Sequence, residues 1–538
     1  MSPPPYERAE LNLLDYDPGR ARKRSRLSVC VVYPNAYSLG MDNLGFQGVY
    51  RMLASTPGVH CERAFFERGL EGLSLESRLP LRQFDVVAFS VSYENDLVNV
   101  LRTLKSAGIA PYAADRPGAS PFIIAGGVGV FTNPEPASSF MDAIFLGEAD
   151  EALGEMLDAY LVSREGGRPS VEEALSGVAG VYVPSVHSPF LRRGTGGGGG
   201  APPRRRHVKD LSRMFCTSVI LSTRSHLGGM FLAEVARGCT RRCGFCAVSS
   251  AYSPLRFVPA ASLLERVDAA GPAARAVGFL GACVADHPGL TGLAATLAAR
   301  KQRVSVSSLR ADVGRAELVS AIAKSGTRTL TIAPEAGSAR LRKMMGKELD
   351  VELLLETASH ASESGFTTLK IYFMLGLPGE RPEDVDAIVS LTQAVSRKFE
   401  LRGKSRSVTL SVSPFVPKAS TPFQWFGAEP EGTLRAKLDR LSGEVRKLRA
   451  VRFTPPSLRS WMLEAAVSRG GWRTGHALHS LVFEETSPEK AWKKAGLSFD
   501  REASEPTDVA APLPWEHVYP ATTAAELKAG HKKACDEM

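Results

Sequence analysis

Apolar strand patterns alternate with helical patterns in two long runs, and this alternation limits the possible folds of the 538-residue chain more than any other feature. The first run has strand candidates at 27–33, 61–66, 84–92, 121–125 and 143–146. The second has six, at 231–236, 276–281, 304–308, 329–334, 368–375 and 408–416. Apolar strands separated by amphipathic helices predict parallel sheets with crossover helices. We therefore predict an α/β protein with a doubly wound N-terminal sheet and a barrel-like second unit.

The last part of the chain has a different pattern. Leu434, Leu438, Leu441 and Val445 form an apolar stripe at helical spacing. We expect a flexible arm over 1–25, a first domain over 26–210 with a Gly/Arg-rich loop at 190–207, a core domain over 215–428, and a mainly helical C-terminal extension over 429–538.

Composition is ordinary for a soluble globular protein, with 44% hydrophobic and 23% charged residues. No run approaches the roughly 20 apolar residues of a membrane span. The N-terminus lacks the apolar core of a secretory signal. Of eight cysteines, three are clustered, and most others lie singly in apolar stretches, unlike a disulfide framework. We expect a cytoplasmic protein without a membrane span.

The chain carries a net charge of +9, from 66 basic and 57 acidic residues. Five of the positive charges crowd the Gly/Arg-rich loop, and two interpretations stay open for them. The loop is either a solvated basic tether or a patch for RNA or an acidic electron donor. The five residues are Arg192, Arg193, Arg204, Arg205 and Arg206.

Three cysteines, Cys239, Cys243 and Cys246, follow the first strand of the second run with the spacing C-x3-C-x2-C. Three thiolates on one short loop can bind three irons of a [4Fe–4S] cluster and leave the fourth iron open. A structural zinc site would need a fourth protein ligand. The next cysteine, Cys283, lies 37 residues farther on, so the spacing favours the cluster.

This motif, with the aromatic Phe245 before its last cysteine, resembles the signature of the radical S-adenosylmethionine (SAM) enzymes. The resemblance implies that Cys239, Cys243 and Cys246 bind a [4Fe–4S] cluster whose open iron binds SAM. One electron from ferredoxin or flavodoxin then allows cleavage of SAM to a 5′-deoxyadenosyl radical. It also implies an open six-stranded partial (β/α)6 TIM barrel for the core.

Small and polar residues follow the predicted barrel strands, where the resemblance implies SAM contacts. Gly281 and Ala282 correspond to the place near the SAM amino group, although the usual Gly-Gly-Glu reads Gly-Ala-Cys here. Ser308, Arg310 and Glu335 would hold the carboxylate and ribose, and Gly376 would flank the adenine. Arg310 and Glu335 could instead form a salt bridge across the barrel mouth.

Asp286 and His287 are polar and lie close to the same mouth. We predict that they contact substrate or transfer a proton. His287 could instead cap the helix that starts near Pro288.

The first domain is similar to the Rossmann-like cobalamin (B12)-binding domain that precedes many radical SAM domains. Ligands of such sheets bind beyond the carboxyl ends of the strands, where this chain has Asn35, Ser90, Gly126 and Gly127. The cobalamin motif Asp-x-His-x-x-Gly, whose His ligates cobalt, is absent. The equivalent turn, from Asn35 to Gly40, has Tyr37 where the motif has His. The alternative is a sheet that binds substrate or nothing.

Nearly the whole chain resembles an uncharacterised subgroup of cobalamin-domain radical SAM proteins. The implied function is a radical SAM enzyme that acts on a small molecule or RNA, and with cobalamin the implied reaction is methyl transfer to an unreactive carbon or phosphorus centre. Without cobalamin, the alternative is hydrogen abstraction on an RNA base, since residues 333–338 resemble tRNA-modifying branches. The rival from another class is a non-catalytic corrinoid- or RNA-binding protein with a structural cluster.

Overall fold

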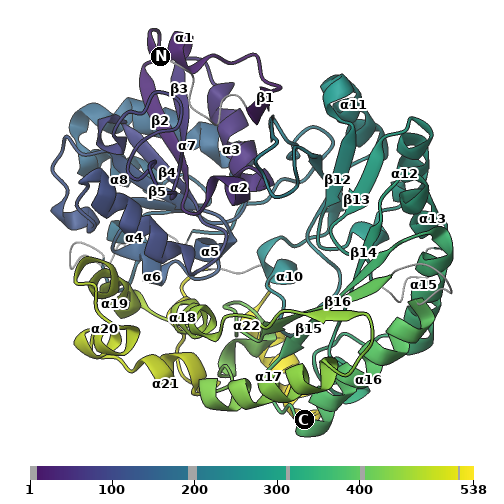
Figure 1. The fold of residues 1–538 in the computed structure, drawn as a ribbon. Coiled ribbons are helices and arrows are strands. Elements are labelled where there is room, and N and C mark those ends of the chain that lie inside the picture. Colours follow the sequence, from purple (N-terminus) through teal and green to yellow (C-terminus); the bar gives the residue numbers. More distant parts are fainter. Residues whose placement is uncertain (1–8, 192–202, 311–315, 400–405, 519–521) are drawn as a thin grey trace.

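The computed structural model describes residues 9–191, 203–310, 316–399, 406–518 and 522–538. It has an α/β fold built on parallel sheets, so the predicted class is confirmed (Figure 1). A six-stranded sheet belongs to the first part of the chain. A three-stranded and a four-stranded sheet belong to the second part.

The first sheet has the strand order β3-β2-β4-β5-β6-β7. Its first five strands run parallel, and β7 pairs antiparallel with β6. The chain passes from β2 to its neighbour β3 on one side, and then crosses to β4, the neighbour of β2 on the other side. The carboxyl ends of β2 and β4 therefore flank the point where ligands bind in such sheets. The strands are β2 (Leu27–Tyr33), β3 (Val59–Phe65), β4 (Val86–Ser90), β5 (Phe122–Gly126), β6 (Ala143–Phe145) and β7 (Val181–Tyr182).

Helices cover both faces of this sheet because successive strand residues point to opposite sides. Val29 and Val31 of β2 join an apolar cluster with α3 (Leu44–Ala54) and α7 (Ala149–Ser163). Val32 of β2 joins the other cluster, with α4 (Asp96–Ala107).

The N-terminal segment differs from the flexible arm that we expected over 1–25. Within its described part, β1 (Glu10–Asn12) pairs antiparallel with β8 (Ile220–Ser222), and α1 (Pro18–Arg22) follows. Glu10 forms an ion pair with the buried Arg63 of β3, with 2.7 Å between Oε2 and Nη2. With only three residues, β1 is too short to show the alternation of apolar and polar residues by which a strand is recognised in a sequence.

Among the described residues of the second part of the chain, seven strands run parallel to their neighbours in two sheets. The three-stranded sheet has the order β13-β12-β9, and the four-stranded sheet has the order β14-β15-β16-β17. A parallel bridge between Leu309 and Ile332 joins the two. The strands are β9 (Phe231–Glu234), β12 (Ala276–Leu280), β13 (Arg303–Val306), β14 (Thr329–Glu335), β15 (Thr368–Leu375), β16 (Ser407–Pro414) and β17 (Val451–Phe453).

Helices lie along the outer side of these strands in Figure 1. Leu354, Val385 and Leu434, one from each of three such helices, share the main apolar cluster with the strands. The helices are α11 (Ala260–Ala270), α12 (Leu290–Ala299), α13 (Ala316–Lys324), α15 (Val351–Ser364), α16 (Pro382–Phe399) and α17 (Glu431–Val445).

The C-terminal part is mainly helical but also contributes β17, which we did not expect. Its helix α19 packs against α4 and α6 (Glu135–Ser138), back on the first sheet. Asn133 donates hydrogen bonds to Ser468 O and Gly470 O, at 3.1 and 2.9 Å. The helices after β17 are α18 (Leu458–Ser468), α19 (Trp472–Phe483), α20 (Pro488–Lys494), α21 (Phe499–Ser504) and α22 (Ala524–Asp536).

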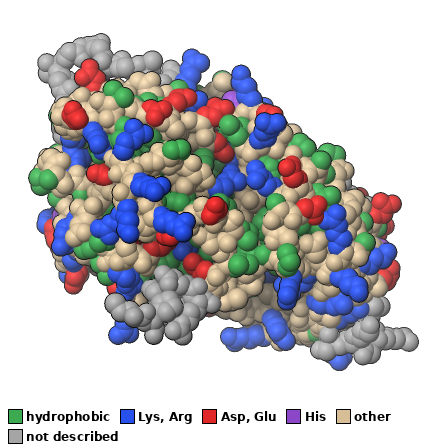
Figure 2. Space-filling model, turned by 90° about the horizontal axis from the view of Figure 1, so that it is seen from above, with side chains coloured by type: hydrophobic (Ala, Val, Ile, Leu, Met, Phe, Trp, Pro, Cys, Tyr) green, Lys and Arg blue, Asp and Glu red, His purple; other side chains and the backbone are tan. Residues whose placement is uncertain are grey.

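The basic surface has no single dominant patch on the face that Figure 2 shows, where Lys and Arg side chains are spread among Asp and Glu. Of the five loop arginines, Arg192 and Arg193 lie outside the described residues. Arg206 pairs with Glu151 and Glu155, and Arg205 donates a hydrogen bond to Ser253 O at 2.6 Å. At least two of these charges therefore serve the fold itself. Among the described residues, we find no helix with the length and apolarity needed to cross a membrane.

Candidate functional site

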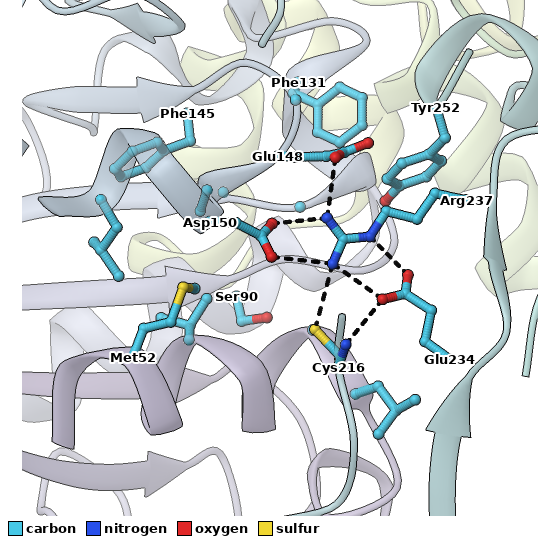
Figure 3. Close-up of a pocket in the computed structure, with 18 of the residues that line it drawn as sticks. Met52, Ser90, Phe131, Phe145, Glu148, Asp150, Cys216, Glu234, Arg237 and Tyr252 are labelled. Carbon is cyan, nitrogen blue, oxygen red and sulfur yellow. Dashed lines mark hydrogen bonds and ion pairs between the residues drawn. The ribbon is translucent and has the colours of Figure 1, made fainter. Parts of the chain in front are cut away.

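A cavity of about 380 Å³ lies where the carboxyl ends of the first sheet meet β9 and β12 (Figure 3). We call it the inter-sheet cavity. Its deep end is apolar, because Val49, Met52, Phe145 and Leu153 line it between the sheet and helices α3 and α7. Of the predicted site residues, five line this cavity together: Ser90, Gly126, Gly127, Gly281 and Ala282.

A buried ion cluster, the Arg237 cluster, forms the polar side of the cavity (Figure 3). Arg237, only 6% exposed, donates to both oxygens of Asp150 at 2.7 and 3.1 Å, and to both oxygens of Glu234 at 2.8 and 3.0 Å. It also donates to Glu148 Oε2 at 3.0 Å. Arg256 donates to the two oxygens of Glu148 at 2.7 and 3.0 Å.

These contacts join the two parts of the molecule. Glu148 and Asp150 follow β6 of the first sheet, Glu234 ends β9, and Arg237 belongs to β10 (Ala236–Arg237). The carboxylates raise the pKa of Arg237 far above its ordinary value, although burial alone would lower it. In the same cluster, hydrogen bonds and charge from Arg256 and Arg237 outweigh burial and lower the pKa of Glu148. Arg237 and Glu148 are thus held in their charged forms.

Gly127 is the cavity residue with the strictest backbone requirement. Its φ is +104°, and a Cβ there would lie 2.3 Å from Val91 O. At the neighbouring Gly126 the nearest atom to a Cβ would be Phe145 Cβ at 3.5 Å, an ordinary contact. The chain can therefore make this turn only with glycine at 127.

We expect Gly127→Ala to lower the free energy of unfolding by about 1–3 kcal/mol, because it adds both strain and a backbone clash. The matched variant Gly126→Ala should change stability by less than about 0.5–1 kcal/mol. Urea unfolding followed by circular dichroism measures both. Equal effects of the two substitutions would contradict the assignment of the strain to Gly127.

The three motif cysteines lie on one segment, residues 238–255, which we call the cysteine loop. Antiparallel pairing of β10 with β11 (Arg256–Phe257) closes its base. Gly244 N donates to Met345 O at 2.8 Å, and Gly244 O accepts from Phe423 N at 3.0 Å. Phe245 packs into the apolar cluster of Phe423 and Leu377. The loop is thus fixed at its base and its middle.

The environments of the three thiols differ. Burial raises the pKa of Cys243, although the charges of Lys347 and Arg310 act in the opposite direction. Burial also raises the pKa of Cys246 to about 11. A hydrogen bond with Cys283 is the main cause that lowers the pKa of Cys239 to about 6. Cys239 is therefore the thiol most readily present as the thiolate that a metal requires.

No group of three or more His, Cys, Asp or Glu side chains within the described part of the chain is arranged around a single metal ion. A four-iron cluster makes a different demand, because each of its three thiolates binds a different iron. The donor set of three thiols on one anchored loop, near Lys347 and Arg310, fits an anionic cluster of that kind.

The remaining predicted SAM contacts, Ser308, Arg310, Glu335 and Gly376, do not line the inter-sheet cavity. Ser308 is half-buried after β13. Glu335 has a φ of +66° and pairs with Lys347, with 2.7 Å between Oε1 and Nζ. Arg310 is close enough for its charge to act on Cys243.

Gly376 follows β15 with a φ of +76° and donates its backbone N–H to the buried side chain of Glu380 at 2.8 Å. Burial raises the pKa of Glu380 to about 7, although Lys437, 3.2 Å away, favours its charged form. The carboxyl group therefore supports the turn that contains Gly376.

Glu380 predicts a pH dependence of stability. Its folded-state pKa lies above the ordinary value of 4.5, so its favourable contribution is complete below about pH 4.5 and is lost as pH rises through 7. The shift corresponds to at most about 3 kcal/mol. We expect Glu380→Gln, which keeps the acceptor for Gly376, to flatten this decline. Urea midpoints of both proteins at pH 5 and pH 8 measure it, and parallel declines would contradict it.

The side chain of His287 has a structural role. It is 1% exposed, its Nε2 donates to Val258 O at 2.7 Å, and its Nδ1 accepts from Gly289 N at 3.1 Å. Both ring nitrogens are thus engaged within the fold, and we do not retain His287 as a proton-transfer residue. Asp286 is half-buried, and its charge acts on Cys239 and Cys283. It remains a candidate.

Asn35 also serves the fold. Its Nδ2 donates to Asp96 Oδ1 at 3.1 Å, and its Oδ1 accepts from Ala36 N at 2.9 Å. It does not line the inter-sheet cavity. The residues that sequence reasoning missed are those of the Arg237 cluster. Their only local signal was an acidic residue after β6 and an arginine just before the cysteine motif.

Comparisons with known proteins agree with this arrangement. Residues 45–184 match the family model "Radical SAM proteins, N-terminal", and residues 233–392 match "Radical SAM superfamily". An uncharacterised protein of Methanocaldococcus jannaschii is 27% identical over 399 residues, which cover 74% of this chain and 79% of that protein. These matches support a radical SAM protein.

Two solved structures share the fold. One is the radical SAM methyltransferase TsrM from Kitasatospora setae, solved with tryptophan and a SAM analogue, at 14% identity and a TM-score of 0.52. It is matched over 87% of this chain and 99% of its own. The other is the cobalamin-dependent SAM radical enzyme OxsB with aqua-cobalamin and SAM, at 13% identity and a TM-score of 0.50, over 87% and 70% of the two chains.

Proposed function

We propose that this chain is a radical SAM enzyme that holds a [4Fe–4S] cluster on Cys239, Cys243 and Cys246 and uses it, with bound cobalamin, for methyl transfer. The observation that carries the proposal is the position of the inter-sheet cavity. It has the ends of the first sheet on one side and β9, β12 and the start of the cysteine loop on the other. The match to the radical SAM family model over 233–392 supports the first half of the proposal.

SAM would bind where Gly281 and Ala282 reach the cavity wall beside the cysteine loop. Glycine at 281 allows a close approach of ligand to backbone. Ser307 Oγ donates to Gly281 O at 3.2 Å and so ties the ends of β12 and β13 together. The topology of β9 to β16 supports the open six-stranded partial barrel that such a site requires.

Cobalamin would bind against the first sheet, whose strand order and helix-covered faces support the doubly wound arrangement. The apolar deep end of the cavity suits a flat organic group, and Ser90 with the backbone of Gly126 and Gly127 offers polar contacts. Asn35 is bonded to Asp96 and so does not replace the missing cobalt ligand. We therefore propose cobalamin without a protein ligand from this turn.

The bound cofactors would supply the radical and methyl-transfer chemistry, and the chain positions them and excludes water. The Arg237 cluster fixes the base of the cysteine loop against the first sheet. The charged form of each group is already compensated, so the site needs no rearrangement of these charges to accept a ligand. Asp286, beside Cys239, is the described carboxylate that we propose for contact with SAM or substrate.

The experiment starts with anaerobic reconstitution of the full chain with iron and sulfide. Dithionite and SAM should then yield 5′-deoxyadenosine, and hydroxocobalamin should bind with a changed absorption spectrum. Gly126→Leu, which places a side chain in the cavity, should abolish cobalamin binding, whereas Gly126→Ala should not. Material that carries about one zinc per chain and no iron would overturn the proposal.

The alternative is radical modification of RNA without cobalamin. It rests on the resemblance of residues 333–338 to tRNA-modifying branches, and the basic loop adds little to it because Arg205 and Arg206 are engaged within the fold. We therefore place it second. An iron-containing protein that makes 5′-deoxyadenosine but leaves the hydroxocobalamin spectrum unchanged would favour it.

A further inference from the structure

The strands of the second part of the chain differ from those of the first sheet in how their two faces are covered. Along β14, β15 and β16, buried residues alternate with half-exposed or exposed ones. In β2, β3 and β4, by contrast, nearly every residue is buried. Parallel strands are usually covered on both faces, as they are in the first sheet. One face of β14 to β16 is therefore open to solvent or to a ligand.

The open face is the one turned away from the helices. Leu369, Ile371 and Phe373 of β15 belong to the main apolar cluster, together with residues of α15 and α16. Successive side chains of a strand point to opposite faces, so Lys370 and Tyr372 point the other way. We call this side of β14 to β17 the inner face. The helices lie along the opposite, outer side of the strands (Figure 1).

A polar row crosses the inner face from strand to strand. Val451 and Phe453 of β17 pack against the main apolar cluster, so Arg452 between them projects from the inner face. Arg452 is the register partner of a threonine of β16, and the same register continues through β15 to β14. The row consists of Thr331, Lys370, Thr409 and Arg452.

The two cations of this row have no acidic partner. Neither Lys370 nor Arg452 forms an ion pair within the part of the chain that the structure describes. Lys370 contacts the ring of Tyr372, with 4.9 Å between Nζ and the ring centroid. Tyr372 is two residues nearer to the carboxyl end of β15. The lysine therefore leans toward the end of the strands where Gly281 and the cysteine loop follow β12 and β9.

The position of Lys370 within the sheet strengthens this observation. A charged residue on an edge strand can serve only to prevent unwanted strand pairing, and Arg452 lies on the edge strand β17. Lys370 lies on β15, between β14 and β16, where lysine is disfavoured. A cation on an open face without a counter-charge is suited to bind an anion that comes from outside the chain.

We propose that the inner face binds the substrate, and that this substrate carries a carboxylate or phosphate group held by Lys370 and Arg452. The assignment to the substrate rests on the proposed function, because the cysteine loop lies at the carboxyl-end side of these strands. Lys370 precedes Leu375, the last residue of β15, by five residues, or about 16 Å of strand. The substrate is therefore elongated, with its anionic group on the order of 10–15 Å from the atom that reacts.

The geometry of the row suits one oxyanion between the two cations. Arg452 lies two strands away from Lys370, which corresponds to about 10 Å between their Cα atoms. Both side chains are long enough to reach an oxyanion in this space. Thr409 lies between them in register, and its hydroxyl group can donate a further hydrogen bond to an oxygen of the ligand.

The test is isothermal titration calorimetry of the full chain, without cofactors, with inorganic pyrophosphate and separately with succinate. The double variant Lys370→Gln, Arg452→Gln removes both charges of the inner face. The matched control, Arg397→Gln with Lys398→Gln, removes the same two charges from exposed positions at the end of α16, on the outer side. Lys370→Arg keeps the charge on the inner face. Urea midpoints of all variants check that a loss of binding is not a loss of folding.

We expect the inner-face variant to bind the preferred anion at least about tenfold more weakly than the wild type, because charge-assisted hydrogen bonds are lost. The α16 control and Lys370→Arg should stay within about threefold of the wild type. Tighter binding of pyrophosphate would assign a phosphorylated substrate, and tighter binding of succinate a carboxylic acid. A wild type that binds neither probe would overturn the inference, as would equal weakening in the inner-face variant and the control.

Failure of the proposed function gives a different result. The titrations need neither iron nor SAM nor cobalamin, so a chain that takes up no iron can still show the loss in the inner-face variant. The anion site would then stand without the enzyme assignment. Conversely, a chain that makes 5′-deoxyadenosine, but whose inner-face variant binds both anions like the wild type, keeps the proposed function and loses the anion site.

Discussion

Replacing Arg237 with methionine is expected to lower the free energy of unfolding by about 3–5 kcal/mol, because the change leaves buried carboxylates without their partner. Arg237 is 6% exposed and is the shared donor for Glu148, Asp150 and Glu234. Glu148 keeps Arg256, so the cost falls on Asp150 and Glu234. The midpoint of urea unfolding, followed by tryptophan fluorescence, measures the loss.

Two further substitutions sharpen this result. Arg237→Lys keeps the charge but not the fork of five donors, so it should lie between the wild type and Arg237→Met. Arg440→Met removes an exposed pair with Asp386 and should leave the midpoint unchanged. If the urea midpoint of Arg237→Met equalled that of the wild type, the Arg237 cluster would contribute nothing to the stability of the contact between the two parts.

Replacing Cys243 with alanine is expected to reduce bound iron from about four per chain to a small fraction of that, since two thiolates cannot retain a four-iron cluster firmly. Cys243 is the most buried of the three motif cysteines and lies on the anchored part of the loop. Iron and sulfide analysis after reconstitution, together with the visible absorption of the cluster, measures the loss. Production of 5′-deoxyadenosine should fall to background.

The matched control is Cys535→Ala. Cys535 is exposed on α22, so its loss should leave iron content and absorption unchanged. If Cys243→Ala kept its full iron content, the motif cysteines would not be the cluster ligands. Equal iron loss from Cys535→Ala would point to nonspecific binding by thiols.

Several residues that line the cavity could be named from the sequence because strand periodicity is a local signal. Ser90, Gly126 and Gly281 come directly after apolar runs, and the carboxyl ends of parallel strands share an edge.

The Arg237 cluster was not predictable, because its partners are separated by long stretches of chain. Arg237, in β10, and Glu148, which follows β6, lie 89 residues apart in the chain. The same limit applies to His287 and Asn35. Their place after a strand was correct, but only the folded structure shows that their side chains turn back to bond Val258 and Asp96.

Helix α19 follows the second part of the molecule in the sequence but packs on α4 and α6 of the first part. The two parts are therefore in contact here as well as at the Arg237 cluster. A hinge motion that separated the first sheet from the second part of the molecule would remove Ala477 and Leu478 of α19 from their apolar contacts. Wide domain opening is therefore costly, and we expect bulky ligands to enter through rearrangement of surface loops, on the faster time scale of such segments.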